Sequence, residues 1–396
     1  MKRNEFIQMC GLLGISLPFQ SLLASCSTDD NAEGTPTDFN GKVLIIGAGA
    51  AGMTAGHLLA QQGIDFEILE AKDVPGGRMR HNPDFTDFPI SLGGEWLHVE
   101  RGVLTEIVND ASVTITQETT PYDLDVDYGI FASSGQRISL SQAGFTIDQK
   151  FVGSSWFGFF ETYVLPSVQS HITYNTPIRA IDYSGEQVVV TDTEGTQYTA
   201  DKLIVTIPVK ILQNGSVDFT PALPAAKQEA INDIQVWNGC KAFIEFTEQF
   251  YPAFVAYMTN PETAGQKLYY DAAYGQNTNR PILGLFAVGV EADPYIQIEE
   301  DGALRDYMLA ELDAVFGDNV ASNAYVKHTF QNWNAEPYAN GSYIVDHENW
   351  RLVRTLGEYV NDTLFFAGDG YTEGEDWSSV HAAARSAIRA VRAITG

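Results

Sequence analysis

Cysteine and basic side chains are scarce in this sequence. Only three cysteines stand among the 396 residues, which excludes a disulfide-rich scaffold, and the sequence predicts no metal site. Lysine and arginine total 23 against 51 aspartate and glutamate residues, so the formal net charge is −28. This charge disfavours binding to nucleic acid or anionic membrane surfaces, and it makes small cationic molecules the natural ligands. Acidity that serves solubility alone is the alternative.

Long apolar runs and internal repeats are also missing, so the sequence predicts neither a membrane-spanning helix nor a solenoid. With 44% hydrophobic residues the chain can bury a large core, and we expect two domains. An apolar stretch follows Lys2 and Arg3 near the N-terminus, but Pro18 and Gln20 interrupt it. It predicts a signal peptide over residues 1–25.

The signal peptide is followed by a cysteine in a characteristic setting. Leu23-Ala24-Ser25-Cys26 resembles the bacterial lipobox, in which the cysteine is lipidated and becomes the mature N-terminus. The resemblance implies an exported cell-envelope lipoprotein that meets the membrane only through this anchor. Residues 26–38 would then form a flexible tether.

The stretch from Lys42 to Met53 predicts a nucleotide-binding turn. Four apolar residues lead into Gly47, Gly49 and Gly52, and an alanine-rich helical run follows. In such a Gly-x-Gly-x-x-Gly turn the first glycine permits the bend, the second lets the backbone approach a pyrophosphate, and the third lets helix and strand pack closely. Phosphates would lie at the helix N-terminus, where unpaired N–H groups favour anions.

A second predicted strand, 66–70, ends in an acid at the position expected for a dinucleotide-binding unit. Glu70 is placed to accept hydrogen bonds from the adenosine ribose hydroxyls. An ordinary βαβ unit with a solvated acid is the alternative. The combination of turn and acid favours a dinucleotide.

Downstream of this acid, Pro75-Gly76-Gly77-Arg78 resembles the flavin amine oxidase family, which includes monoamine oxidases, polyamine oxidases and lysine-specific histone demethylases. Later segments follow the family's order, among them 92–96, 333–343 and 364–369. The resemblance implies an α/β fold with a Rossmann-like FAD-binding domain, a parallel sheet with helices, interleaved with an α+β substrate-binding domain carrying a mixed sheet. The residues that it places against FAD are Gly47, Gly49, Ala51, Gly52, Glu70, Ala71, Gly76, Gly77, Arg78, Gly93, Gly94, Glu95, Trp96, Ile178, Thr206, Trp333, Gly368, Asp369 and Val380.

The same resemblance implies three residues at the reacting end of the cofactor. Lys241 matches the family's flavin-facing lysine on a predicted strand, although a strand lysine that reaches solvent is the alternative. Tyr343 would form one wall of the family's aromatic cage, but Val380, at the opposite wall, is not aromatic. His98 falls where several polyamine oxidases contact the substrate chain, and a structural imidazole is its alternative. Ser342 stands where monoamine oxidases bond a cysteine to the flavin, so noncovalent FAD is expected.

Domain boundaries follow from where these segments fall. We expect the FAD-binding domain over residues 39–100, 171–215 and 356–396, and the substrate-binding domain over 101–170 and 216–355. Within them the sequence predicts a hairpin over 188–199 and helices over 303–316 and 378–394.

The resemblance implies oxidation of a C–N bond of a small cationic amine, either a polyamine or a monoamine. The expected products are an imine, hydrolysed to an aldehyde and ammonia or amine, and H2O2 from O2. Trp96 occupies the locus at which amino-acid oxidases hold a substrate carboxylate with arginine, which favours amines without a carboxylate. Two alternatives stay open: a flavin dehydrogenase or desaturase acting on a lipophilic substrate, and a non-catalytic surface protein that contains FAD.

Overall fold

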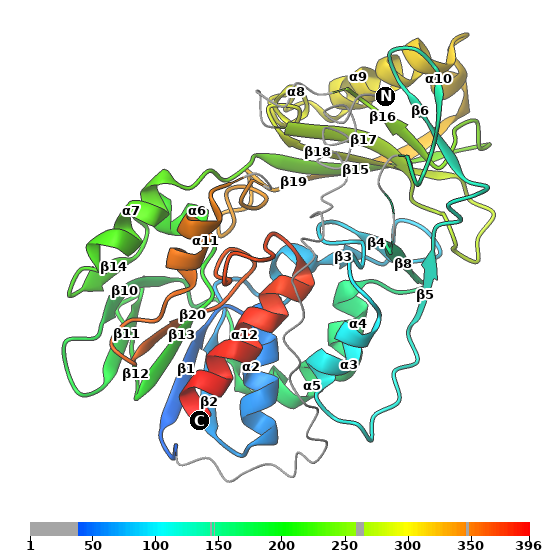
Figure 1. Ribbon diagram of the computed structural model, residues 1–396. Coiled ribbons are helices and arrows are strands. Elements are labelled where there is room, and N and C mark those ends of the chain that lie inside the picture. The colour runs from blue at the N-terminus through cyan, green and yellow to red at the C-terminus, as the bar shows by residue number, and fades with distance from the viewer. Residues whose placement is uncertain (1–38, 143–144, 146, 259–264, 346–347) are drawn as a thin grey trace.

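The computed structural model describes residues 39–396 apart from 143–144, 146, 259–264 and 346–347. The predicted signal peptide and the predicted tether that begins at Cys26 lie outside the described residues. The described chain forms two lobes, one built on a parallel sheet and the other on a larger mixed sheet (Figure 1). Among the described residues, no helix is both long and apolar enough to cross a membrane.

The first lobe centres on a five-stranded parallel sheet of order β20-β13-β1-β2-β9. Side chains alternate across it, so that Val43 and Ile45 face α2 and α12 while Leu44 and Ile46 join a second core on the other face. Burial on both faces explains why these strands are almost entirely apolar. The strands are β1 (Lys42–Ile46), β2 (Asp65–Leu69), β9 (Ile172–Thr173), β13 (Lys202–Val205) and β20 (Leu364–Phe366).

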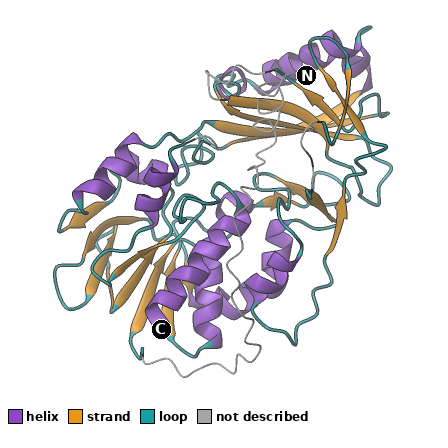
Figure 2. Ribbon diagram, viewed as in Figure 1, coloured by secondary structure: helices purple, strands orange, loops and turns teal. Residues whose placement is uncertain are grey.

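Helices cover one face of this sheet, as Figure 2 shows. The alanine-rich helices α2 and α12 approach closely because small side chains meet at their contact. The predicted strand, turn and helix at the start of the lobe are confirmed, with β1 followed directly by α2. The helices are α2 (Ala50–Gln61), α3 (Gly102–Val108), α4 (Trp156–Tyr163), α5 (Leu165–Val168) and α12 (Val380–Thr395), with the 3-10 turns η1 (Gly77–Met79) and η2 (Gln169–His171).

A four-stranded sheet of order β12-β11-β10-β14 packs on the other face of the parallel sheet. Its β11 and β12 pair antiparallel, which confirms the hairpin predicted over 188–199. Its strands are β10 (Ile178–Asp182), β11 (Val188–Asp192), β12 (Gln197–Ala200) and β14 (Asp218–Thr220), and the helices beside it are α6 (Val209–Gln213), α7 (Ala225–Asp233) and α11 (Trp350–Gly357).

The second lobe is a seven-stranded mixed sheet of order β19-β15-β18-β17-β16-β6-β7. Apolar residues of α9 cover one face, and the opposite face carries a second aromatic cluster toward the first lobe. The strands are β6 (Tyr128–Phe131), β7 (Arg137–Ser139), β15 (Gly239–Phe246), β16 (Phe254–Ala256), β17 (Gly265–Asp271), β18 (Ile282–Gly289) and β19 (Tyr325–Asn332), and the helices are α8 (Asp293–Ile296), α9 (Asp301–Phe316) and α10 (Val320–Ala324).

Two small antiparallel pairs lie between the lobes (Figure 1). They are β3 (His81–Asn82) with β4 (Ile90–Ser91), and β5 (Glu118–Pro121) with β8 (Gln149–Val152). β4 precedes one segment that lines the cavity, and β8 follows another. These pairs therefore place side chains from the first half of the chain opposite β15.

Elements of both predicted domains pack in the first lobe. From the stretch 101–170, assigned above to the substrate-binding domain, α3, α4 and α5 pack in the first lobe. From the stretch 216–355, β14, α7 and α11 do the same. The reason is local amphipathicity, since the apolar sides of these short helices fit the core beside α2 or beside α6, and this cannot be read from motif order.

Candidate active site

A cavity of about 480 Å³ is lined by both lobes and is continuous between them. This volume lies in the range usual for ligand and cofactor sites. Of the residues that the sequence analysis placed at the site, all except Gly52 line the cavity. Segments as far apart as Gly47 and Val380 therefore meet there, and the structure brings the predicted set together.

The three glycines of the first turn have three different environments. Gly47 has φ +103°, which permits the bend. A Cβ on Gly52 would lie 1.9 Å from the Gly47 carbonyl oxygen, so close helix–strand packing requires glycine there. Gly49 has an ordinary φ of −85° and no protein atom within 4 Å of the position of a Cβ, so nothing in the chain demands a glycine. The free space beside Gly49 opens on the cavity at the start of α2, which fits the close approach of a dinucleotide pyrophosphate.

Glu70 lies buried at the end of β2, beside this turn. Its Oε2 accepts a hydrogen bond from the Ala48 backbone N–H at 2.6 Å, and its Oε1 accepts one from the Lys72 N–H at 2.9 Å. Burial raises the pKa of Glu70, while these two bonds oppose the rise. Both oxygens keep acceptor capacity, which suits them to ribose hydroxyls. Ile178 begins β10 and lines the cavity on the same lobe.

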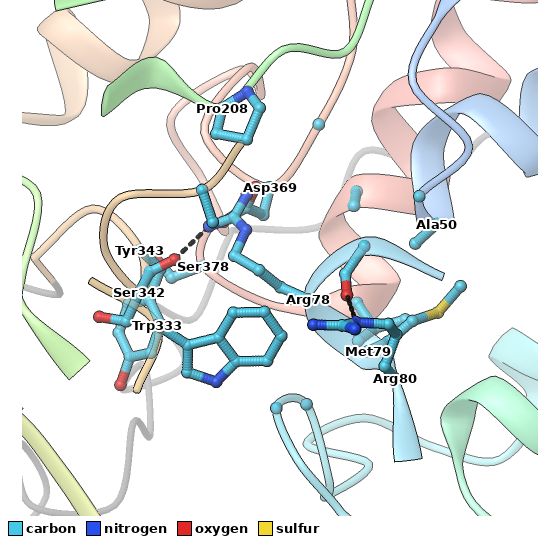
Figure 3. A pocket seen from close by; sticks show the side chains of 18 of the residues that line it. Ala50, Arg78, Met79, Arg80, Pro208, Trp333, Ser342, Tyr343, Asp369 and Ser378 are labelled. Carbon is cyan, nitrogen blue, oxygen red and sulfur yellow. Dashed lines mark hydrogen bonds and ion pairs between the residues drawn. The ribbon is translucent and has the colours of Figure 1, made fainter. Parts of the chain in front are cut away.

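Arg78 and Asp369 form a two-pronged ion pair at the middle of the cavity wall. Arg78 Nη2 lies 2.5 Å from Asp369 Oδ1, and Nη1 lies 3.1 Å from Oδ2. Arg78 also donates to the Ser342 carbonyl oxygen, as Figure 3 shows beside Trp333 and Tyr343. The C-terminal strand β20 and the loop before α12 thus meet the Gly-Gly-Arg turn directly.

A second ion-pair cluster on the cavity wall joins the segment after β2 to the loop after β19. Glu336, from the loop after β19, accepts hydrogen bonds from Lys72 and from Arg80 Nη2, the latter at 2.9 Å. These three residues and Trp333 line the cavity, and Arg80 lies over the Trp333 ring. Both arginines that line the cavity are therefore paired with carboxylates.

The predicted lysine lies on β15, whose alternation places it on the cavity face. Lys241 is 3% exposed, so the solvent-reaching alternative is wrong. Its ammonium donates to Ser91 O at 2.9 Å, to Gly93 O at 3.2 Å and to Glu95 Oε2 at 2.5 Å. Burial lowers the pKa of Lys241, and the Glu95 carboxylate opposes that shift.

Aromatic side chains form the wall around this lysine. The Trp96 ring lies 4.8 Å from the Tyr270 ring and 6.4 Å from the Phe286 ring, and Trp96 Nε1 donates to Tyr122 Oη at 2.9 Å. Tyr343 lies against Trp237 at 5.7 Å. The cavity end beside Lys241 is thus apolar and aromatic, an environment that disfavours a charged amine relative to a neutral one.

His98 is oriented by a carboxylate within the same cavity. Its Nδ1 lies 2.7 Å from Asp148 Oδ1, and both residues line the cavity. The Asp148 side chain is 5% exposed and that of His98 is 28% exposed, so the imidazole is the more accessible partner. An aspartate that fixes the imidazole suits His98 to a polar contact with a ligand.

Sequence reasoning missed Tyr270, Phe286, Asp148 and Lys150. Each comes from a stretch with no motif. Tyr270, Phe286 and Lys150 reach the site or its immediate neighbour on paired strands, and Asp148 directly precedes β8. Side chains alternate between the two faces of the strands in 265–271 and 282–289. This alternation divides the positions into two sets, but the sequence does not show which set faces the cavity and which faces the helix.

Comparison with known proteins shows which families and proteins this chain resembles. The family model described as flavin containing amine oxidoreductase matches residues 160–395, and one for an NAD(P)-binding Rossmann-like domain matches residues 45–111. The chain is 23% identical over 421 residues to lysine-specific histone demethylase 2 of Homo sapiens, with 84% of this chain and 51% of that protein covered. It is 23% identical over 441 residues to polyamine oxidase 2 of Arabidopsis thaliana, with 88% and 86% covered. The chain thus spans about half the length of the histone demethylases it matches.

Solved structures of putrescine oxidase resemble the fold. A variant with redesigned cofactor binding has a TM-score of 0.70 at 15% identity, covering 90% of this chain and 98% of that one. The wild-type protein bound to putrescine gives the same TM-score and identity, with 90% and 99% covered. At this identity the likeness concerns the fold, and it confirms the predicted two-lobe α/β arrangement.

Proposed function

Because the chain belongs to the family of flavin-containing amine oxidoreductases, we propose that it oxidises a C–N bond of a small cationic amine, with FAD bound in the cavity. When bound, FAD would supply a two-electron acceptor for the hydride lost from the carbon beside the nitrogen, and O2 would take these electrons to give H2O2 while water hydrolyses the imine. A polyamine or a monoamine is the proposed substrate.

One observation carries this proposal: a single cavity joins the dinucleotide turn to an aromatic chamber. Gly49 and Glu70 line its first-lobe part, and Trp96, Tyr270 and Phe286 line its second-lobe part. A cofactor held at the turn can therefore reach a substrate held between aromatic rings without any movement of the lobes.

The residues of the chamber have two tasks in such a reaction. The aromatic walls exclude water, which lowers the pKa of an entering ammonium and favours the neutral amine that hydride loss requires. His98, held by Asp148, offers a polar contact for a second nitrogen farther along the substrate chain. Rings such as Trp96 also attract a cationic group through their faces.

The charges that line the cavity support an amine without a carboxylate. The arginines and lysines among the described cavity-lining residues all contact carboxylates: Lys72 and Arg80 contact Glu336, Arg78 contacts Asp369, and Lys241 contacts Glu95. A substrate carboxylate would have to compete with one of these ion pairs. An amine meets no such competition.

The decisive experiment is to titrate the purified yellow protein with a panel of amines under nitrogen and then to admit air. We expect diamines, polyamines or monoamines to bleach the flavin, and we expect air to restore the colour with one H2O2 per amine oxidised. Bleaching without peroxide would favour a dehydrogenase, which the apolar lining by Phe145, Phe254 and Leu268 suits. Retained FAD that no amine bleaches would favour the non-catalytic alternative.

We also propose that the protein is exported and anchored by a lipid on Cys26, although this residue lies outside the described part of the chain. The lipobox-like segment and the apolar stretch before it support the proposal. Replacing Cys26 by serine should release the protein from the membrane fraction. Retention of the variant there would contradict the anchor.

A further inference from the structure

Three buried charges meet beside the cavity: Glu95 and Lys241 line it and were predicted as site residues, and Lys150, which does not line it, contacts Glu95. The Glu95 carboxylate lies 2.5 Å from Lys241 Nζ through Oε2 and 3.3 Å from Lys150 Nζ through Oε1. Each of the three side chains is no more than 7% exposed. We call Glu95, Lys150 and Lys241 the charge triad.

Lys241 has no hydrogen left for another acceptor in this arrangement. An ammonium carries three N–H groups, and these go to Ser91 O, Gly93 O and Glu95. Lys241 can therefore act on a bound cofactor through its charge, whereas a hydrogen bond to a water at the cofactor would cost one of these contacts. Glu95 also accepts from Tyr270 Oη at 2.5 Å, so its Oε2 receives two hydrogen bonds.

Lys150 gives the triad its excess positive charge. It comes from β8 and donates to the backbone carbonyl oxygens of Asp271 and Ala272 at 3.2 and 2.7 Å. The Asp271 carboxylate accepts from Ala273 N at 3.0 Å and Gln249 Nε2 at 3.3 Å and makes no ion pair with Lys150, although the Lys150 charge opposes the rise of the Asp271 pKa that burial causes. Two ammonium groups thus share one carboxylate, and the triad has a net charge of +1.

The balance of charge within the triad follows from its geometry. Burial alone would raise the pKa of Glu95, but the two ammonium groups hold it below its usual value. A buried group of net charge +1 is costly by itself, and a negative charge that forms in the adjacent cavity offsets this cost.

We propose that Glu95, Lys150 and Lys241 act as one electrostatic unit, in which Lys150 restores the positive charge that Glu95 removes from Lys241. The unit favours the negative charge that FAD gains on reduction. Lys150 is a positioning residue in this account, because it acts on the cavity through Glu95. The inference rests on the proposed binding of FAD but not on the identity of the amine.

Variants that change the net charge of the triad one unit at a time test the proposal. Lys150→Met lowers the net charge to zero, Glu95→Gln raises it to +2, and the double variant has a net charge of +1. The readout is the affinity of the FAD-bound protein for sulfite, an anion that bleaches bound flavin without an amine or oxygen. Relative to the unaltered protein, we expect Lys150→Met to weaken the affinity about tenfold and Glu95→Gln to strengthen it about tenfold. The double variant should fall within about threefold of the unaltered protein.

Two further variants separate charge from structure. Lys150→Arg keeps the positive charge and should keep the sulfite affinity of the unaltered protein. This variant serves as the test if Lys150→Met does not retain FAD. Lys267→Met removes a buried lysine of the seven-stranded sheet, one that pairs with Glu311 of α9 at 2.7 Å away from the cavity, and should leave sulfite affinity unchanged. If affinity follows loss of thermal stability across the set, or if Lys150→Met leaves it unchanged, the triad is structural and the proposal is wrong. A failure to bleach with amines would contradict the proposed function and would leave this result standing.

Discussion

The two ends of the cavity are built by different means. At the first-lobe end, the backbone of one continuous segment, from Gly47 to Ala51, lines the cavity, with open space beside Gly49 and the Glu70 carboxylate next to it. At the second-lobe end, side chains from three separate stretches meet around Glu95. The first end depends on space and backbone geometry, and the second depends on charge balance and ring packing. Substitutions at the two ends should therefore weaken the site by different mechanisms.

The largest effect is expected at Gly52. A Cβ there would lie 1.9 Å from the Gly47 carbonyl oxygen, an atom of the backbone that cannot move without disturbing β1. Gly52→Ala should lower the free energy of unfolding by about 3 kcal/mol or more. Denaturant unfolding of the FAD-free protein measures this, and an unfolding midpoint equal to that of the parent would contradict the packing argument.

A buried lysine in the first lobe provides a contrast with Lys241. Lys227 on α7 donates to the Thr355 and Leu356 carbonyl oxygens and makes no ion pair with a described carboxylate, and burial lowers its pKa from 10.5 to about 7. Between these values the unfolded chain binds a proton that the folded chain does not, so stability should rise with pH. The contribution is about 1.4 kcal/mol per pH unit.

The check is the difference in free energy of unfolding between the parent and Lys227→Met from pH 7 to pH 10. This difference removes the contributions of other titrating groups, and it should move in favour of the parent as the pH rises. A difference that stays constant over this interval would show that Lys227 is charged in the folded protein.

Gly49→Ala is the matched partner of the Gly52 variant. No protein atom lies within 4 Å of the added methyl group, so the stability of the FAD-free protein should change by less than about 1 kcal/mol. FAD affinity should fall at least about tenfold, because the methyl group occupies the space left for the pyrophosphate. Fluorescence titration with FAD measures the affinity. Equal affinity for the variant and the parent would place the cofactor elsewhere.

The smallest effect is expected at the aromatic end. Replacing His98 by alanine removes one polar contact near Asp148 and should raise the apparent KM for diamines about threefold to tenfold. The KM for monoamines serves as the control and should stay unchanged, because a monoamine has no second nitrogen. A parallel rise for both classes would leave His98 with a structural role.

The same contrast explains how much could be predicted from the sequence. Gly47, Gly52 and Glu70 have roles that depend on neighbours a few residues away, so their spacing predicted the βαβ unit and the turn. Lys241 was found through its flanking residues, but Lys150 was not, because its partner Glu95 is distant in sequence and the two meet only after β8 docks beside β17. The lobe on which the short helices pack could not be predicted for a related reason, since amphipathicity alone does not show which lobe a helix covers.

The order of strands in the first sheet has a consequence for how the protein is made. β20 lies beside β13 at one edge of that sheet, and α12 packs on α2, yet both elements come from residues 364–395, far along the chain from β1. The parallel sheet is therefore completed, and Asp369 meets Arg78, only after these residues have been synthesised. Removing the last two turns of α12 would take Val391 and Ile394 out of the core that they share with α2 and β1, the part of this lobe that is synthesised first.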